Sequence, residues 1–150
     1  MCTNIVQLSG AVGSSAGSIN GFYEPIDELV GNASVYKKLG DGIDVWIEYY
    51  APYGRWYVRP TASRGTGSGY AQATISPPRA LEDCPMSSWE VHDGSIWVRQ
   101  ASFSVAVSSK ASFEAAQAAQ VVIYRRFTID ILNEFFCIIC TCGSDALMYV

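Results

Sequence analysis

The most regular alternation of apolar and polar residues lies in the middle of the chain, where short segments are separated by glycine and proline turns. Residues 34–38 (SVYKK) and 45–50 (VWIEYY) flank Gly40-Asp41-Gly42, and residues 55–60 (RWYVRP) follow the sequence APYG. Aromatic and β-branched residues in short runs are typical of strands, and glycine provides the positive φ that tight turns need. We therefore predict two consecutive β-hairpins here.

The same pattern recurs at both ends of this region. Residues 89–100 (WEVHDGSIWVRQ) predict a hairpin that turns at Asp93-Gly94, and residues 103–107 (FSVAV) predict a strand with its apolar side inward. Near the start, Asn20-Gly21 predicts a tight turn that joins a short strand to a second strand, which Pro25 ends.

The character of the sequence changes after Val107. Residues 111–126 are rich in alanine and glutamine without glycine or proline, so they predict a helix, with a linker at Ser108-Ser109 before it. The chain then divides into a β-rich module over residues 3–107 and a helical, apolar C-terminal extension over residues 108–150. We expect a mainly β fold, an antiparallel small barrel or sandwich of about six to eight strands, followed by the helical extension.

The extension carries large apolar residues near helical spacing: Phe127, Ile131, Leu132, Phe135 and Ile139. A helix here would present an apolar stripe that something must cover. An uncharged apolar run, residues 135–144, is about half the roughly 20 residues of a spanning helix, so no transmembrane segment is predicted. The alternatives are docking into a protein assembly, contact with a membrane surface, packing on the β module, or an extension unrelated to the module. We favour docking.

Charge and cysteine content narrow the class of protein. Charged residues make up 16% of the chain, against about 25% in an average soluble domain, and the net charge is −4, so the chain lacks the basic surface that nucleic acid requires. The N-terminus has no positively charged flank before an unbroken apolar run, which predicts no signal peptide. Five unevenly spaced cysteines do not suggest a secreted disulfide framework, and we expect an intracellular protein.

Two motifs raise the question of a cofactor. Cys137, Cys140 and Cys142 have the close spacing of a metal site, but no fourth ligand lies nearby, so inert buried thiols are favoured over zinc binding or lipidation. The glycines of residues 64–70 (RGTGSGY) lack the spacing and context of a nucleotide fingerprint, and predict a mobile surface loop. No cofactor or metal is predicted.

The pair His92-Asp93 is the strongest candidate for catalysis, because a histidine oriented by a carboxylate can activate a nucleophile such as Cys84. His92 is the only histidine, and it lies where a strand enters a turn. Adjacent strand residues project to opposite faces, so Asp93 is poorly placed to orient His92. We predict no catalytic residues and no enzyme activity; a hydrolase that uses His92 is the disfavoured alternative.

Aromatic residues are more numerous than a small core needs. Rings beside carboxylates suit flat ligands, sugars or peptides, and the candidate ligand-binding residues are Tyr36, Trp46, Tyr50, Tyr53 and Tyr57. The alternative is that these rings are core residues, as most aromatics in a small β module are. The four tryptophans, Trp46, Trp56, Trp89 and Trp97, are expected to lie mainly in the core.

The succession NGFYEP, SVYKK, VWIEYY, RWYVRP and WEVHDGSIWVRQ resembles a repeated β-rich module common in proteins of dinoflagellates and other unicellular eukaryotes. The resemblance covers residues 3–107 and leaves the extension out. It implies an uncharacterised binding or scaffolding unit and offers no catalytic residues to carry over. We expect a non-catalytic module that binds a protein or a carbohydrate; the alternative is an accessory structural subunit of a larger, membrane-associated assembly, docked through its tail.

Overall fold

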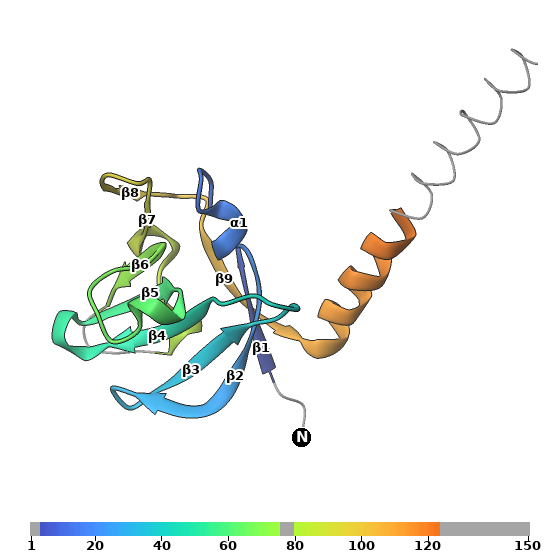
Figure 1. Ribbon diagram of the computed structural model, residues 1–150, viewed down its shortest axis with the longest axis horizontal. Coiled ribbons are helices and arrows are strands. Elements are labelled where there is room, and N and C mark those ends of the chain that lie inside the picture. Colours follow the sequence, from blue (N-terminus) through green and yellow to red (C-terminus); the bar gives the residue numbers. More distant parts are fainter. Residues whose placement is uncertain (1–3, 76–79, 124–150) are drawn as a thin grey trace, which may run out of the picture. The chain divides into compact units, whose positions relative to one another are not determined.

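The structure, a computed structural model, describes residues 4–75 and 80–123. Its strands form one antiparallel sheet in the order β8-β7-β6-β5-β4-β3-β2-β1-β9, which curls into a half-barrel (Figure 1). The predicted fold class, a mainly β antiparallel barrel with a C-terminal helix, is confirmed. Nine strands are found in the described residues, more than expected.

Most strands follow one another as neighbours in the sheet, and only β9 returns to pair with β1. The strands are β1 (Asn4–Ser9), β2 (Gly21–Val30), β3 (Ala33–Lys38), β4 (Trp46–Tyr50), β5 (Arg55–Arg59), β6 (Ala71–Thr74), β7 (Trp89–His92), β8 (Trp97–Arg99) and β9 (Ser104–Ser109). The short helices are α1 (Ala16–Ile19), η1 (Ala51–Tyr53), η2 (Thr61–Ser63), η3 (Leu81–Asp83) and η4 (Met86–Ser88).

The three hairpins predicted from the alternating pattern are confirmed. β3 pairs with β4, β4 pairs with β5, and β7 pairs with β8, all in antiparallel register. The APYG turn is a single 3-10 turn closed by Gly54, whose φ of 61° explains the glycine at that position.

The prediction of a hairpin turn at Asn20-Gly21 is wrong. Residues 16–19 form the helical turn α1 instead of a strand, and Asn20 caps its C-terminal end with extended backbone. The Asn20 side chain hydrogen bonds both the amide and the carbonyl of Ala11, at 3.0 and 2.9 Å. The Asn20 side chain therefore fixes the loop that contains Ala11. A pattern of adjacent residues does not reveal this role.

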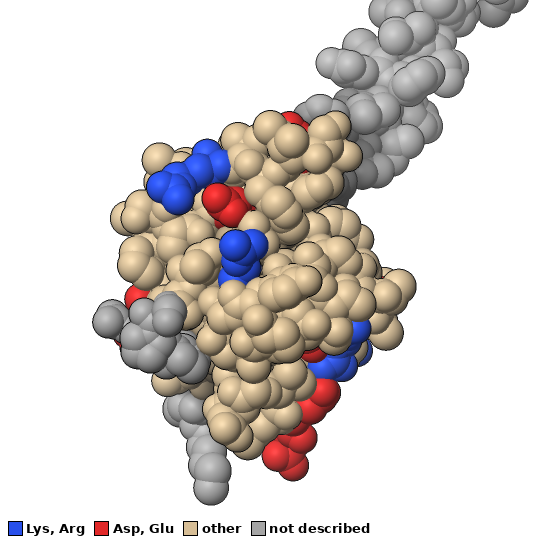
Figure 2. Space-filling model, turned by 90° about the vertical axis from the view of Figure 1, so that its left-hand side faces the viewer, with Lys and Arg blue, Asp and Glu red and all other residues tan. Residues whose placement is uncertain are grey.

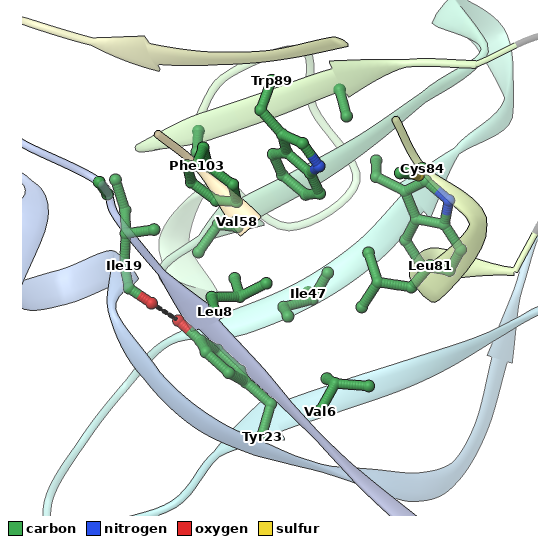
Figure 3. Packing of buried hydrophobic residues seen from close by; sticks show 14 of the residues in the cluster. Val6, Leu8, Ile19, Tyr23, Ile47, Val58, Leu81, Cys84, Trp89 and Phe103 are labelled. Carbon is green, nitrogen blue, oxygen red and sulfur yellow. Dashed lines mark hydrogen bonds between the residues drawn. The ribbon is translucent and has the colours of Figure 1, made fainter. Parts of the chain in front are cut away.

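Hydrogen bonds from two side chains of the sheet, Tyr23 and Lys38, hold α1 in place. The Tyr23 hydroxyl donates to the carbonyl of Ile19 at 2.6 Å (Figure 3), and the Lys38 ammonium group donates to the carbonyls of Gly17 and Ser18 at 2.7 and 2.9 Å. Free carbonyls at a helix end need such donors. Burial lowers the pKa of Lys38. The aromatic stretch after Gly21 thus fixes a helical turn against the sheet.

Pro25 does not end its strand as predicted. β2 runs on to Val30, and Pro25 lies within it, opposite Tyr36 of β3. The pairing register shifts between Pro25 and Leu29, which is where a proline is tolerated in a sheet, since its missing amide falls at an irregularity.

The strand β9 also runs further than predicted, through Ser109, and pairs with β1 over its whole length. The helix is described from residue 110 to residue 123, so the expected linker at Ser108-Ser109 is wrong. Val107 is 54% exposed, against the expected inward orientation. By its contacts the chain divides into two compact units, residues 1–110 and 111–150.

The core lies on the inner face of the curled sheet (Figure 3). Trp89 stacks on Phe103 with ring centroids 4.5 Å apart, and Leu81 and Cys84 pack into the same cluster. Trp56 and Trp89 are 1% and 0% exposed, as expected of core tryptophans, whereas Trp46 and Trp97 are only partly buried and lie outside this cluster. The expectation that all four tryptophans form the core therefore holds for two of them.

Candidate ligand-binding pocket

A pocket of about 550 Å³ opens beside the β2–β3 hairpin and η3. It is lined by residues 31–34, Tyr36, Trp56 and residues 80–82. Its volume lies within the range of about 300 to 1,000 Å³ that is usual for small-molecule sites. The pocket is the candidate functional site.

The turn between β2 and β3 forms one wall of this pocket. Gly31 and Asn32 both have positive φ, 61° and 62°, the conformation of a two-residue hairpin turn that follows the twist of the strands. A side chain at Gly31 would lie 3.1 Å from the Tyr49 ring and 3.4 Å from Ala51, so glycine also allows the hairpin to pack closely against β4. The hairpin is in this way fixed to the core.

Two aromatic rings line the pocket from neighbouring parts of the sheet. Tyr36 is half-buried and its ring meets that of Trp56 edge to face, with centroids 6.3 Å apart. Trp56 is almost completely buried and in turn meets Tyr49 at 5.6 Å. Trp56 therefore forms a buried floor, and Tyr36 adds a half-buried ring that carries a hydroxyl group.

The 3-10 turn η3 supplies the remaining wall. Leu81 is fully buried in the core and anchors the turn, while its neighbour Glu82 is exposed and lines the pocket. Burial raises the pKa of Tyr36, and the negative charge of Glu82 raises it further. A hydroxyl group and a carboxylate therefore share this opening.

The five aromatic residues predicted to bind a ligand are not brought together. Tyr36 lines the pocket, but Trp46, Tyr50 and Tyr57 lie on the opposite face of β4 and β5, because side chains alternate along a strand. Tyr53 lies in η1 and is 60% exposed. Trp56, Ser34 and Asn32 were missed as site residues; the Gly31-Asn32 dipeptide between two apolar runs was the available signal for this hairpin.

The opposite face is closed by the loop between β5 and β6. Glu48 accepts hydrogen bonds from the Gly65 amide at 2.8 Å and from Arg64 Nε at 2.9 Å, and Arg64 also pairs with Glu28 at 2.6 Å. Gly67 allows the loop to approach Tyr53, since a Cβ there would lie 2.3 Å from the ring. The loop predicted to be mobile is instead anchored at several points.

Arg59 lies beneath this loop with no exposed surface. Its guanidinium group lies 4.1 Å from the Tyr57 ring centre, donates to the carbonyls of Ser63 and Thr66, and is 3.5 Å from Glu48. Burial lowers the pKa of Arg59, and the charge of Glu48 opposes this shift. Of the three aromatics on this face, Tyr57 is fully buried and Trp46 lies between the charges of Lys37 and Arg64, at 5.1 and 4.7 Å.

The groups considered for catalysis are engaged in local structure. His92 Nδ1 accepts a hydrogen bond from the Gly94 amide at 3.2 Å, and the Asp93 carboxylate accepts from the amides of Ser95 and Ile96 at 2.8 and 2.9 Å. Asp93 thus shapes the turn. Burial raises the pKa of the Cys84 thiol to about 12, which disfavours the reactive thiolate at neutral pH.

Other predicted residues lie outside the described part of the chain. These are the tail residues Phe127, Ile131, Leu132, Phe135 and Ile139, together with Cys137, Cys140 and Cys142. Within residues 4–75 and 80–123, no three His, Cys, Asp or Glu side chains are grouped as a metal site would require. None of the helices described there is both long enough and apolar enough to span a bilayer.

Charged residues are sparse on one face of the molecule (Figure 2), as they are in the composition. On the face shown in Figure 2, lysine, arginine, aspartate and glutamate appear in small separate groups among uncharged residues. No protein-family model, curated protein or solved structure matches this chain. The resemblance to the protist module therefore remains a prediction from its sequence motifs.

Proposed function

We propose that this protein is a non-catalytic binding module whose ligand site is the pocket lined by Tyr36, Trp56 and Glu82. The observation that carries the proposal is the pocket itself: a concave space of about 550 Å³ with an aromatic floor and polar groups at its mouth. Such a combination of apolar contact area and a few orienting polar groups is the usual form of a ligand site.

The rigidity of the pocket walls favours a ligand-binding role over a purely scaffolding role. The hairpin turn is fixed by Gly31 against Tyr49, and η3 is fixed by the buried Leu81. A site that is formed before the ligand arrives loses less conformational entropy on binding. A scaffolding unit needs no such preformed cavity.

The engagement of the candidate catalytic groups supports a non-catalytic role. The Asp93 carboxylate accepts a hydrogen bond within its own turn, and His92 accepts one from the Gly94 amide. Cys84 is buried, and its thiol has a raised pKa. Nucleophilic catalysis by a thiol with a raised pKa requires a base in contact with it, and among the described residues no hydrogen bond pairs Cys84 with His92. A binding function requires no such base.

The test is a titration of the isotope-labelled full chain with a panel of short peptides and oligosaccharides, followed by amide NMR. We expect at least one compound to shift the amides of residues 31–36 and 80–82. The variant Ala80→Phe, which fills the pocket from an exposed position, should abolish these shifts; Ala101→Phe makes the same exchange at an exposed turn outside the lining and should leave them intact. A panel in which no compound perturbs these residues, or any compound that is chemically converted by the protein, would contradict the proposal.

A further inference from the structure

The described lining of the pocket carries one charged side chain, and its charge is negative. Glu82 is its only charged lining residue among those described, and neither lysine nor arginine nor histidine joins it. Over the described residues Glu82 forms no salt bridge, whereas Glu28 and Glu48 both have Arg64 as a partner. Among the described residues, Glu82 is thus an exposed carboxylate without an ion-pair partner that lines the pocket beside Tyr36.

The carboxylate and the aromatic wall face the same space. The charge of Glu82 acts on the Tyr36 hydroxyl strongly enough to contribute to its raised pKa, and both residues line the pocket. A ligand group in this space would therefore meet a negative charge on one side and the face or edge of a ring on the other. An anionic group would be repelled.

A guanidinium group matches this arrangement in shape and charge. It is planar, stacks on aromatic rings, and donates two parallel hydrogen bonds to a carboxylate. An ammonium group offers the charge without the planar fork. The net charge of −4 adds a long-range attraction for a basic partner.

We propose that the pocket receives an arginine side chain from a basic segment of a protein partner, with Glu82 as its counter-ion and the half-buried Tyr36, which packs on the buried Trp56, as its aromatic wall. This inference rests on the proposed binding function and names the ligand class of the same site. The partner segment enters from the side of η3, where Glu82 is exposed.

The probe is the acetylated and amidated tripeptide Gly-Arg-Gly, compared with Gly-citrulline-Gly, in which a neutral urea replaces the guanidinium group. NMR titration of the full chain measures both affinities. We expect the arginine peptide to bind roughly tenfold more tightly than the citrulline peptide, because the ion pair and the cation–π contact are both lost in the latter. Raising the salt concentration should narrow the difference.

Two variants with the same change of charge locate the effect. Glu82→Gln should weaken arginine binding to the citrulline level, whereas Asp83→Asn, at the adjacent exposed residue outside the lining, should change it by less than about twofold. Both positions are exposed, so both variants should fold, which circular dichroism verifies.

The other outcomes each overturn the inference. Equal affinity for the two peptides, or equal losses for Glu82→Gln and Asp83→Asn, would show that no guanidinium-specific site exists. Binding of chitobiose at residues 31–36 and 80–82 without arginine binding would overturn the ligand class and preserve the binding function. Absence of shifts with every probe would overturn the inference together with the proposed function.

Discussion

The two faces of strands β4 and β5 are both buried, by different means. On the core face, Ile47, Tyr49, Trp56 and Val58 pack into the hydrophobic cluster. On the opposite face, the β5–β6 loop covers Glu48 and Arg59 and is held there by hydrogen bonds and ion pairs, while Tyr57 is buried against Arg59. Burial alone therefore does not identify the hydrophobic core of this sheet. The pocket lies at the edge of the core face, where Tyr36 is only half-buried.

The largest difference between the faces should appear when the same residue type is truncated on each. Trp89 is fully buried in the core cluster, so Trp89→Ala should cost about 3 to 5 kcal/mol of the free energy of unfolding. Trp97 is only partly buried, and its ring meets that of Tyr57 on the face opposite the core cluster. Trp97→Ala should therefore cost less than about 2 kcal/mol of the free energy of unfolding. Chemical denaturation measures both; equal costs would erase the proposed distinction between the faces.

The opposite face should depend on charge pairing. Glu48→Ala leaves Arg59 buried without its carboxylate, and removing one partner of a buried pair costs roughly 3 kcal/mol. Replacing both by apolar residues, as in Glu48→Leu with Arg59→Met, should recover much of the loss, because neither charge then remains in the interior. Glu28→Ala, at the more exposed partner of Arg64, should cost under about 1 kcal/mol. A double variant less stable than Glu48→Ala alone would contradict this explanation.

The hydrogen bond beneath α1 should contribute less than either of these. Tyr23→Phe keeps the ring in the core but leaves the Ile19 carbonyl without its donor, at a cost of about 1 kcal/mol. Tyr53→Phe, at an exposed ring, serves as the control and should be nearly neutral. Hydrogen exchange of the amides of residues 16–20 checks whether the loss is local to α1, as expected, or spread through the sheet, which would argue against a capping role.

The smallest expected effect is a pH dependence at the rim of the opposite face. Hydrogen bonds from Thr61 and Trp46 hold the pKa of Asp44 below its ordinary value. The folded state therefore binds this proton less readily than the unfolded state. The stabilisation is fully present above the ordinary carboxyl pKa of about 3.9 and is lost as the pH falls through the lowered value.

Asp44→Asn should remove this part of the loss of stability in acid. The melting temperature, measured between about pH 2 and about pH 5, tests this, because that pH range contains the ordinary carboxyl pKa and extends below it. Asp41→Asn, at an exposed aspartate that forms no hydrogen bond with the described residues, is the control for the loss of one carboxylate. Identical profiles for Asp44→Asn and the unmodified chain would refute the role of this contact.

The sequence pattern was sufficient for the hairpins and the fold class, because alternation with period two and glycine-bearing turns are local signals. It failed at Asn20, at Pro25 and at Ser108-Ser109, where the outcome depends on partners outside the local pattern: Ala11, Tyr36 and β1. An isolated turn dipeptide does not distinguish a hairpin from a helix cap. A small residue at a strand end does not distinguish a linker from paired strand.

The candidate site was only partly predictable for the same reason. Alternation places Tyr36 and Trp46 on opposite faces, and this could be worked out once the register of β3 and β4 was known. Which face is open depends on the β5–β6 loop, whose anchors are Glu48 and Glu28 from other strands. Glu82 carries no local signal at all, because its role comes from the approach of η3 to the β2–β3 hairpin.

The claim that the molecule has one open face and one closed face is tested most directly by mapping amide shifts during titration of the full chain with the Gly-Arg-Gly peptide. The account predicts shifts that saturate at residues 31–36 and 80–82, with Trp46, Tyr50, Tyr57 and Arg64 unperturbed. Shifts concentrated at Trp46, Tyr50, Tyr57 and Arg64, with residues 31–36 and 80–82 unchanged, would contradict it and place the binding surface on the face that the β5–β6 loop covers.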